Sequence, residues 1–352
     1  MTKDNASSEH IIPQFMGKFD QNPTVKICKK CNNEVFSKLE ENYKEDTPEG
    51  IFFQMLNLSD DNYLIKIRNG KTSYSLIGKN ETGPSEEMFP FFNRDLERIP
   101  LSQIKFKKDD YDVVIVLEKL SKNKKRQEKM KNLRKLCKNI DHKTIRIFCG
   151  KEEFDDAISL LKEVGIESAG LIKPKSFTLS DSAIALEFKQ NRCIGYKFDA
   201  VVSKIAFNYF AYCAIKSNYK HLLFHPNFNE VKLHIRGTIP ILGFISKIEH
   251  MKIYDKNFNN AGNDKKVRLL GYTICFNVER DIMRDCEMII AQVSLLGFGN
   301  YRIPIGAIPK ELRKNNFGSA HIFDPYAKNH LQMSRNPKAP LSTKSKFSLF
   351  NV

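Results

Sequence analysis

Apolar side chains recur at helical spacing in four segments of the chain. The most apolar segment, residues 198–217 (FDAVVSKIAFNYFAYCAIKS), is predicted to form a helix inside the body of the protein. Residues 151–168 (KEEFDDAISLLKEVGIES) place apolar side chains on one face and reach a glycine at Gly165, which predicts an amphipathic helix with a glycine cap. Shorter helical patterns cover residues 31–46 and 120–138.

Alternating and continuous apolar runs predict strands in much of the remaining chain. In residues 63–78 (YLIKIRNGKTSYSLIG), Asn69 and Gly70 form the dipeptide of a tight hairpin turn between two strands. The other predicted strands are rich in β-branched and aromatic residues. They cover residues 51–58, 111–120, 144–150, 232–245, 267–279 and 288–306. The sequence TPEG after the first helix is expected to end that helix.

Together these elements predict an α+β protein with a small N-terminal head and a larger mixed α/β body. At 352 residues the chain is longer than one ordinary domain. We expect the head at residues 1–47, a β-rich region with a basic helix at 48–140, and an α/β domain at 141–335. Residues 336–352, rich in Pro, Ser and Lys, are expected to form a flexible tail.

Composition favours a soluble, globular protein. Hydrophobic residues make up 41% of the chain and charged residues 28%, without an apolar run long enough to cross a bilayer. The N-terminal sequence MTKDNASSEH has neither the basic start nor the apolar stretch of a signal peptide. We therefore expect a cytoplasmic protein that has no membrane partner and keeps its eight cysteines reduced.

The charge balance favours a polyanionic partner. Lys and Arg outnumber Asp and Glu by 57 to 41, a net charge of +16, which would attract nucleic acid, although a lysine-rich solvated surface has the same composition. The segment 120–138 carries nine basic residues and one acidic residue, and is either a phosphate-binding helix or a solvated connector. Candidate nucleic-acid contacts are Lys29, Lys30, Lys124, Lys125 and Arg126.

Two short motifs near the N-terminus, EHIIP and CKKCNN, contain groups that phosphodiester hydrolysis needs. The reaction requires a base that activates water and a divalent cation that stabilises charge. His10 can act as the base, while the carboxylate of Glu9 and the amide oxygen of Asn32 suit a hard cation such as Mg²⁺. Adjacent strand residues point to opposite faces, so Glu9 and His10 can share a site only near a strand end or turn.

In this order and spacing, the two motifs resemble the HNH endonucleases, a family with a ββα-metal finger, in the branch that runs acid-His-Ile-x-Pro and later C-x-x-C-Asn. The resemblance implies that His10 is the general base and that Glu9 and Asn32 are metal ligands. It also implies that Asn22, between the two motifs, orients His10 through its backbone or side chain. The helix after Asn32 would press the finger onto the phosphate backbone.

This sequence departs from the family pattern at two places. Many relatives hold a structural zinc ion with four cysteines, whereas only Cys28 and Cys31 are present here. Zinc would need residues upstream or a distant cysteine or histidine, or the finger stands without it. Some relatives also have a histidine ligand four residues after the Asn32 position, where this chain has Phe36. The remaining sparse coordination suits Mg²⁺ or Mn²⁺.

These features predict a metal-dependent endonuclease that cuts DNA, with RNA as the less favoured substrate. The body would recognise the substrate, form a homo-oligomer or bind a regulatory protein, and the family resemblance implies a role in bacterial defence against foreign DNA. Two other interpretations stay open. The chain could be a nucleic-acid-binding protein with a catalytically inactive finger, or Cys28 and Cys31 could form a redox pair.

Overall fold

The protein is a mixed α/β chain that forms two compact units. The computed structural model describes residues 5–17, 19, 22–56, 62–78, 88–93, 98–121, 126–166, 184–190, 196–239, 250–254, 271–295, 299–312, 319–324 and 329–334. Unit 1 comprises residues 1–41, 195–248 and 270–352, and unit 2 comprises residues 42–194 and 249–269. Both units therefore join segments that are distant in sequence. The expected boundaries at 47, 140 and 335 instead separate domains that are each one continuous segment. The expected tail lies outside the described residues.

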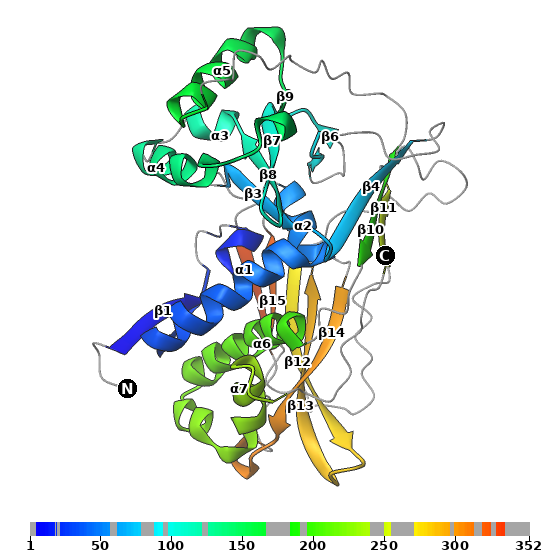
Figure 1. Ribbon diagram of the computed structural model, residues 1–352. Coiled ribbons are helices and arrows are strands. Elements are labelled where there is room, and N and C mark those ends of the chain that lie inside the picture. Colours follow the sequence, from blue (N-terminus) through cyan, green and yellow to red (C-terminus); the bar gives the residue numbers. More distant parts are fainter. Residues whose placement is uncertain are drawn as a thin grey trace. The chain divides into compact units, whose positions relative to one another are not determined.

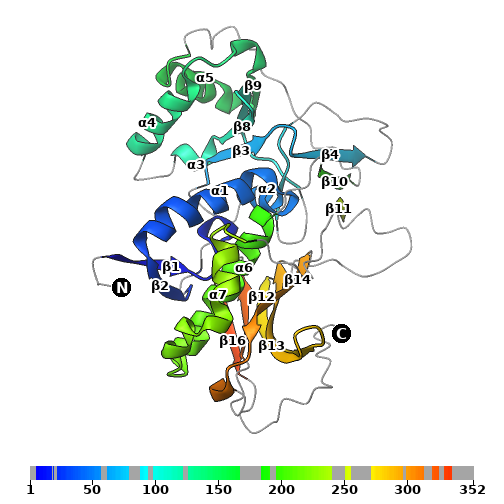
Figure 2. The ribbon, with the colours of Figure 1, turned by 60° about the horizontal axis from the view of Figure 1, so that its bottom comes forward.

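The centre of unit 1 is a five-stranded antiparallel sheet with the order β14-β13-β12-β15-β16. Its strands are β12 (Tyr272–Asp281), β13 (Cys286–Leu295), β14 (Gly299–Ala307), β15 (Ser319–Asp324) and β16 (Asn329–Ser334). Helix α6 (Tyr196–Lys216) contacts β13 and β14, and helix α7 (Asn229–Ile235) contacts β14 (Figures 1 and 2). The ring of Tyr209 on α6 stacks on Phe276 of β12 with 5.1 Å between centroids, so the predicted apolar helix lies on the sheet.

Unit 1 also contains a two-stranded antiparallel hairpin, β1 (Ala6–His10) and β2 (Thr24–Cys28). A π-helical segment, Cys31–Phe36, follows the hairpin and continues into α1 (Ser37–Asp46), which confirms the helix expected at 31–46. The loop between the strands is tied to the large sheet, because Tyr272 Oη of β12 donates a hydrogen bond of 2.6 Å to the carbonyl of Met16. Phe19 adds edge-to-face contacts to Tyr272 and Phe323. The hairpin and the sheet therefore share one core.

Unit 2 contains two larger sheets and one short strand pair in its described residues. The four-stranded sheet has the order β3 (Leu64–Arg68), β8 (Tyr111–Val116), β7 (Gln103–Lys108) and β9 (Arg146–Phe148). The three-stranded sheet has the order β11 (His250–Tyr254), β10 (Ile184–Gln190) and β4 (Thr72–Gly78), and the pair is β5 (Phe91–Phe92) with β6 (Arg98–Ile99). The helices are α2 (Pro48–Met55), α3 (Glu118–Ser121), α4 (Arg126–Cys137) and α5 (Phe154–Glu163).

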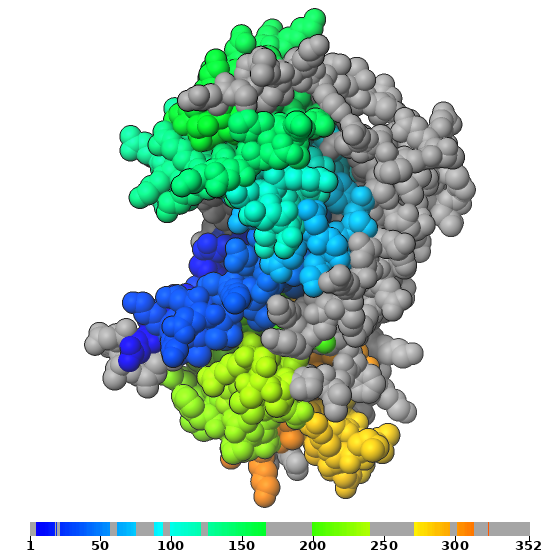
Figure 3. All heavy atoms as spheres, viewed as in Figure 1, coloured from blue at the N-terminus to red at the C-terminus, as the bar shows by residue number. Residues whose placement is uncertain are grey.

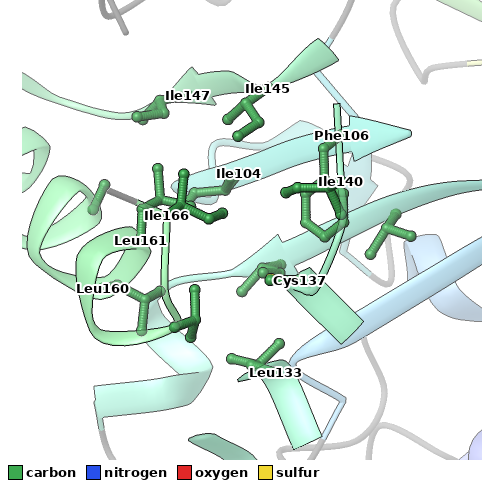
Figure 4. Close-up of a cluster of buried hydrophobic side chains, with 14 of the residues drawn as sticks. Ile104, Phe106, Leu133, Cys137, Ile140, Ile145, Ile147, Leu160, Leu161 and Ile166 are labelled. Atoms are coloured by element: carbon green, nitrogen blue, oxygen red, sulfur yellow. The ribbon is translucent and has the colours of Figure 1, made fainter. Parts of the chain in front are cut away.

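Helices α4 and α5 close the main hydrophobic core of unit 2. In Figure 4, Leu133 and Cys137 of α4 and Leu161 of α5 lie with Ile104 and Phe106 of β7 in one buried cluster. The helices expected at 120–138 and 151–168 are thus present. Because the apolar stripe of the basic helix is part of a core, α4 is anchored in unit 2 and presents its charged face to solvent.

The strand prediction for residues 51–58 is wrong, since this segment belongs largely to helix α2. The Thr47 side chain accepts a hydrogen bond of 2.9 Å from the Gly50 amide, and Pro48 occupies the first helical turn, so TPEG ends one helix and begins the next. A Cβ atom on Gly50 would lie 2.2 Å from the Tyr43 carbonyl oxygen, so a side chain at this position would clash with the end of the preceding helix. Every residue of α2 is buried, and a continuous apolar run does not distinguish a buried strand from a buried helix.

Two further strand expectations are corrected. Asn69 and Gly70 do form a turn, with a positive φ of 75° at Gly70, but β3 pairs with β8 and β4 pairs with β10, so the flanking strands do not form a hairpin. Residues 232–235 belong to helix α7, while residues 240–249 lie outside the described part of the chain. The strands expected at 144–150, 267–279 and 288–306 are present in β9, β12, β13 and β14. The strand expected at 111–120 is present as β8, but residues 118–120 belong to helix α3.

We expect unit 1 to lose stability in mild acid through His234, which is fully buried on α7. Its Nδ1 donates a hydrogen bond of 3.0 Å to the Ile239 carbonyl. Burial lowers the pKa of His234, although Asp199 and the Ile239 carbonyl oppose the shift. A lowered pKa means that His234 binds a proton more readily in the unfolded chain than in the folded protein. The contribution of His234 to the free energy of unfolding is therefore complete above the ordinary histidine pKa and is lost as the pH falls below it.

Thermal unfolding between about pH 7 and about pH 5 tests this for the wild type and for His234→Gln, which keeps a hydrogen-bond donor but does not titrate. The melting temperature of the wild type should fall more steeply with acidification than that of the variant. Equal slopes of melting temperature against pH in the two proteins would contradict the role of His234 in the loss of stability.

Candidate functional site

The N-terminal hairpin places Glu9 and His10 at the end of a strand. In β1, Glu9 pairs with Val25 and His10 pairs with Thr24 of β2. His10 is the last residue of the strand, and the chain then enters the loop through Ile11, whose amide donates to the Pro23 carbonyl at 3.0 Å. A strand end is the position at which two neighbouring side chains can serve one site.

Asn22 closes the loop that follows His10. Its side-chain Nδ2 donates a hydrogen bond of 2.8 Å to the carbonyl of Ile12, two residues beyond His10. Ile11, Ile12 and Met16 in the same loop are fully buried. Asn22 thus fixes the backbone immediately after the histidine, and its contact is to the Ile12 carbonyl rather than to the imidazole.

His10 is half-buried at the start of this loop. Its Nδ1 lies 3.5 Å from Nε2 of Gln14, at the limit of a hydrogen bond. A contact of this length leaves the imidazole tautomer unassigned.

The Glu9 side chain is engaged by a buried lysine of the body. Lys204 on α6 contacts both Glu9 and Glu40 of α1 through its Nζ atom. The Lys204 side chain is 1% exposed, compared with 12% for Glu9 and 21% for Glu40. Burial raises the pKa of Glu40, a shift that Lys204 opposes and the charge of Glu9 reinforces. Three segments distant in sequence therefore meet at one ammonium group.

Asn32 lies in the π-helical segment Cys31–Phe36, which begins at the second cysteine. Both the amide and the hydroxyl of Ser37 donate to the Asn32 carbonyl, the hydroxyl at 2.9 Å, and the bond from the Ser37 amide spans five residues. Such segments are rare and are found frequently at functional sites. Phe36 lies nearly one turn of this wider helix after Asn32, and its ring faces Lys204 Nζ at 5.3 Å from the centroid.

Cys28 and Cys31 interact with one another at the junction of β2 and the helix. Hydrogen bonds from the Cys31 backbone and side chain lower the pKa of Cys28, with a smaller contribution from the charge of Arg236. Burial and the Cys28 partner raise the pKa of Cys31. Within the described part of the chain, no group of three or more His, Cys, Asp or Glu side chains is positioned to hold a metal ion, so the possible zinc site at Cys28 and Cys31 gains no further ligand there.

The candidate nucleic-acid contacts fall in both units. Lys29 and Lys30 are exposed beside the cysteines, and Lys30 lies 4.0 Å from Glu34. The blue atoms of the hairpin and the following helix form part of the molecular surface in Figure 3. Arg126 begins α4 in unit 2 and is paired with Glu163 at 2.9 Å. Lys124 and Lys125 lie outside the described residues.

Sequence reasoning missed Lys204, Glu40 and Arg236. The sequence does contain one signal for the first of these, since Lys204 interrupts the apolar run VVSKIAF in the most apolar helix. A lysine at a buried position requires an anionic partner. The sequence did not indicate that the partners would be Glu9 and Glu40.

No protein-family model matches the chain, and the searches of curated proteins and of solved structures found no match. The helices in the described residues include none that has both the length and the apolar composition to span a membrane.

We expect Cys28 to be the more reactive thiol of the pair, because its pKa is lowered while that of Cys31 is raised. The thiolate is the nucleophile, so alkylation of Cys28 should become rapid at a lower pH than for an ordinary cysteine. Iodoacetamide labelling at several pH values, read by mass spectrometry for each cysteine, measures this. Arg236→Gln should slow labelling of Cys28, and denaturation should remove the difference between the two thiols. Faster labelling of Cys31 in the folded protein would contradict the expectation.

Proposed function

We propose that the chain is a metal-dependent endonuclease whose β1–β2 hairpin and following helix form a ββα-metal finger of the HNH type. His10 serves as the general base, Glu9 and Asn32 as metal ligands, and Asn22 as the residue that positions the loop. The observation that carries the proposal is the hydrogen bond from Asn22 to the Ile12 carbonyl. The family resemblance gives Asn22 the role of orienting the His10 imidazole through its backbone or side chain, and this bond supports an indirect form of that role, through the loop backbone two residues after His10.

The residues of the finger fit a hard divalent cation by their chemistry. Glu9 supplies a carboxylate and Asn32 an amide oxygen, which Mg²⁺ and Mn²⁺ accept together with water and phosphate oxygens. A bound cation would stabilise negative charge on the phosphoryl group and on the leaving oxygen. His10 would accept the proton of the attacking water, and the loop held by Asn22 would keep its imidazole at the strand end.

DNA is the substrate that we propose, with RNA less favoured. The net charge of +16 would promote association with either polyanion through counterion release. Lys29 and Lys30 are exposed on the helix of the finger itself, where they would contact phosphates next to the scissile bond.

A second candidate function is nucleic-acid binding without cleavage. The contact between Glu9 and Lys204 favours it, because a carboxylate that is held by an ammonium group is less available to a metal ion. Phe36, at the position where some HNH relatives have a histidine ligand, points in the same direction. This alternative requires binding to DNA that is independent of divalent cations.

Plasmid nicking distinguishes the two functions. Purified protein should convert supercoiled plasmid to the nicked or linear form with Mg²⁺ or Mn²⁺ and should be inactive with EDTA. Removing a general base costs about 100-fold or more in rate, so His10→Ala should lose cleavage, while Asn32→Ala should lose most of it and should require more metal. His221→Ala, which changes an exposed histidine outside the finger, is the matched control and should retain full activity.

Cleavage that persists in both His10→Ala and Asn32→Ala would contradict the assigned site. DNA binding in a gel-shift assay without cleavage under any divalent cation would favour the second function instead.

A further inference from the structure

The cluster of Lys204, Glu9 and Glu40 contains two carboxylates and a single ammonium group. With all three ionised, its net charge is −1. Lys204 is almost completely inaccessible to solvent, and both glutamates are largely buried. The ammonium group therefore acts as an internal counter-cation for the carboxylate of Glu9.

Phe36 makes the cluster more favourable for an ammonium group. Its ring lies with the centroid 5.3 Å from Lys204 Nζ, within the range of a cation–π interaction. The phenyl ring has no lone pair to offer to a metal ion. Where some HNH relatives have a histidine that binds the metal, this chain thus has a side chain that stabilises an organic cation.

We propose that Lys204 is a positioning residue that competes with the divalent cation for Glu9. The ammonium group contacts the Glu9 carboxylate, and a divalent cation would have to take its place there. Glu9 would then give up Lys204, while Glu40 would keep its contact to the lysine. The inference rests on the proposed function, because it concerns the cation that Glu9 would bind in the finger.

Glu40 is essential to this exchange. A buried ammonium group that loses its last carboxylate is strongly unfavourable, and Glu40 is the second described carboxylate that contacts Lys204. With Glu40 in place, Glu9 can give up its contact to Lys204 and the ammonium group still has a carboxylate partner. Since Lys204 lies on α6, 195 residues from Glu9 in the sequence, a helix of the body would set the metal affinity of the finger.

Direct Mn²⁺ titration of the full-length protein without DNA, followed by electron paramagnetic resonance of the free ion, tests this proposal. Lys204→Met changes the cluster charge from −1 to −2 and removes the competitor, so it should tighten Mn²⁺ binding by about tenfold or more. Glu40→Gln changes the charge to zero and leaves Lys204 with Glu9 alone, so it should weaken binding by a similar factor. The double variant should lie between the two single variants, and Glu9→Gln should lose the site.

Two matched controls change the same charges elsewhere. Lys216→Met alters an exposed lysine on the same helix as Lys204, and Glu41→Gln alters an exposed glutamate next to Glu40. Both should bind Mn²⁺ as the wild type does. Circular dichroism shows which variants are folded, and if Lys204→Met does not fold, the comparison of Glu40→Gln with the wild type decides alone.

The proposal is overturned if folded Glu40→Gln binds Mn²⁺ as tightly as the wild type, if folded Lys204→Met binds it no more tightly, or if Glu9→Gln leaves binding unchanged. A plasmid cleavage assay on the same proteins separates this result from the fate of the proposed function. The predicted order of affinities without cleavage would support the exchange and reject the nuclease, whereas cleavage without that order would do the reverse.

Discussion

The contact of one buried lysine with two glutamates is the constraint on which the N-terminal site depends. Glu9 comes from the hairpin, Glu40 from the helix that follows it, and Lys204 from α6, with sequence separations of 195 and 164 residues between the lysine and its partners. Removing one member of a buried ion pair typically costs about 3–5 kcal/mol. The hairpin is too small to provide a core of its own. The Lys204 contacts and the Tyr272–Met16 hydrogen bond therefore attach it to the rest of unit 1.

The same contact that stabilises the hairpin limits its chemistry. A carboxylate that neutralises a lysine is a weaker ligand for a divalent cation, because the ion must displace an existing charge partner. The loop around His10 carries no comparable conflict, since Asn22 bonds to the backbone at Ile12 rather than to the half-buried imidazole. In this account, Asn22 and the Tyr272–Met16 hydrogen bond hold the loop beside the proposed base, whereas Lys204 of α6 controls the proposed metal ligand.

Elements with a clear period could be predicted from the sequence. Helices α5 and α6 and strand β8 have distinct apolar patterns, and each is present in the structure. The failures occurred where the local pattern is ambiguous. The continuous apolar run of α2 fits either a buried helix or a buried strand. The turn at Asn69–Gly70 forms as expected, but its flanking strands find better partners in β8 and β10, and pairing of this kind is decided by tertiary packing.

The candidate site could likewise be predicted only where a local pattern was present. The helix after Asn32 could be predicted from its local apolar pattern, whereas the two strands around Glu9 and His10 had no pattern of their own and were implied only by the family resemblance. Lys204 and Glu40 could not be assigned to the site, since no local pattern links a lysine in an apolar helix to a particular carboxylate. The proximity of Arg236 to the two cysteines could not be predicted either, because no local pattern links residues so distant in sequence.

The most direct measurement of the central claim is a crystal structure of the full-length protein soaked with Mn²⁺, with the ion located by its anomalous scattering. The account predicts a peak within coordination distance of the Glu9 carboxylate, with Lys204 retained by Glu40. Manganese sites found only elsewhere, with Glu9 still bound to Lys204 at saturating metal concentration, would contradict it.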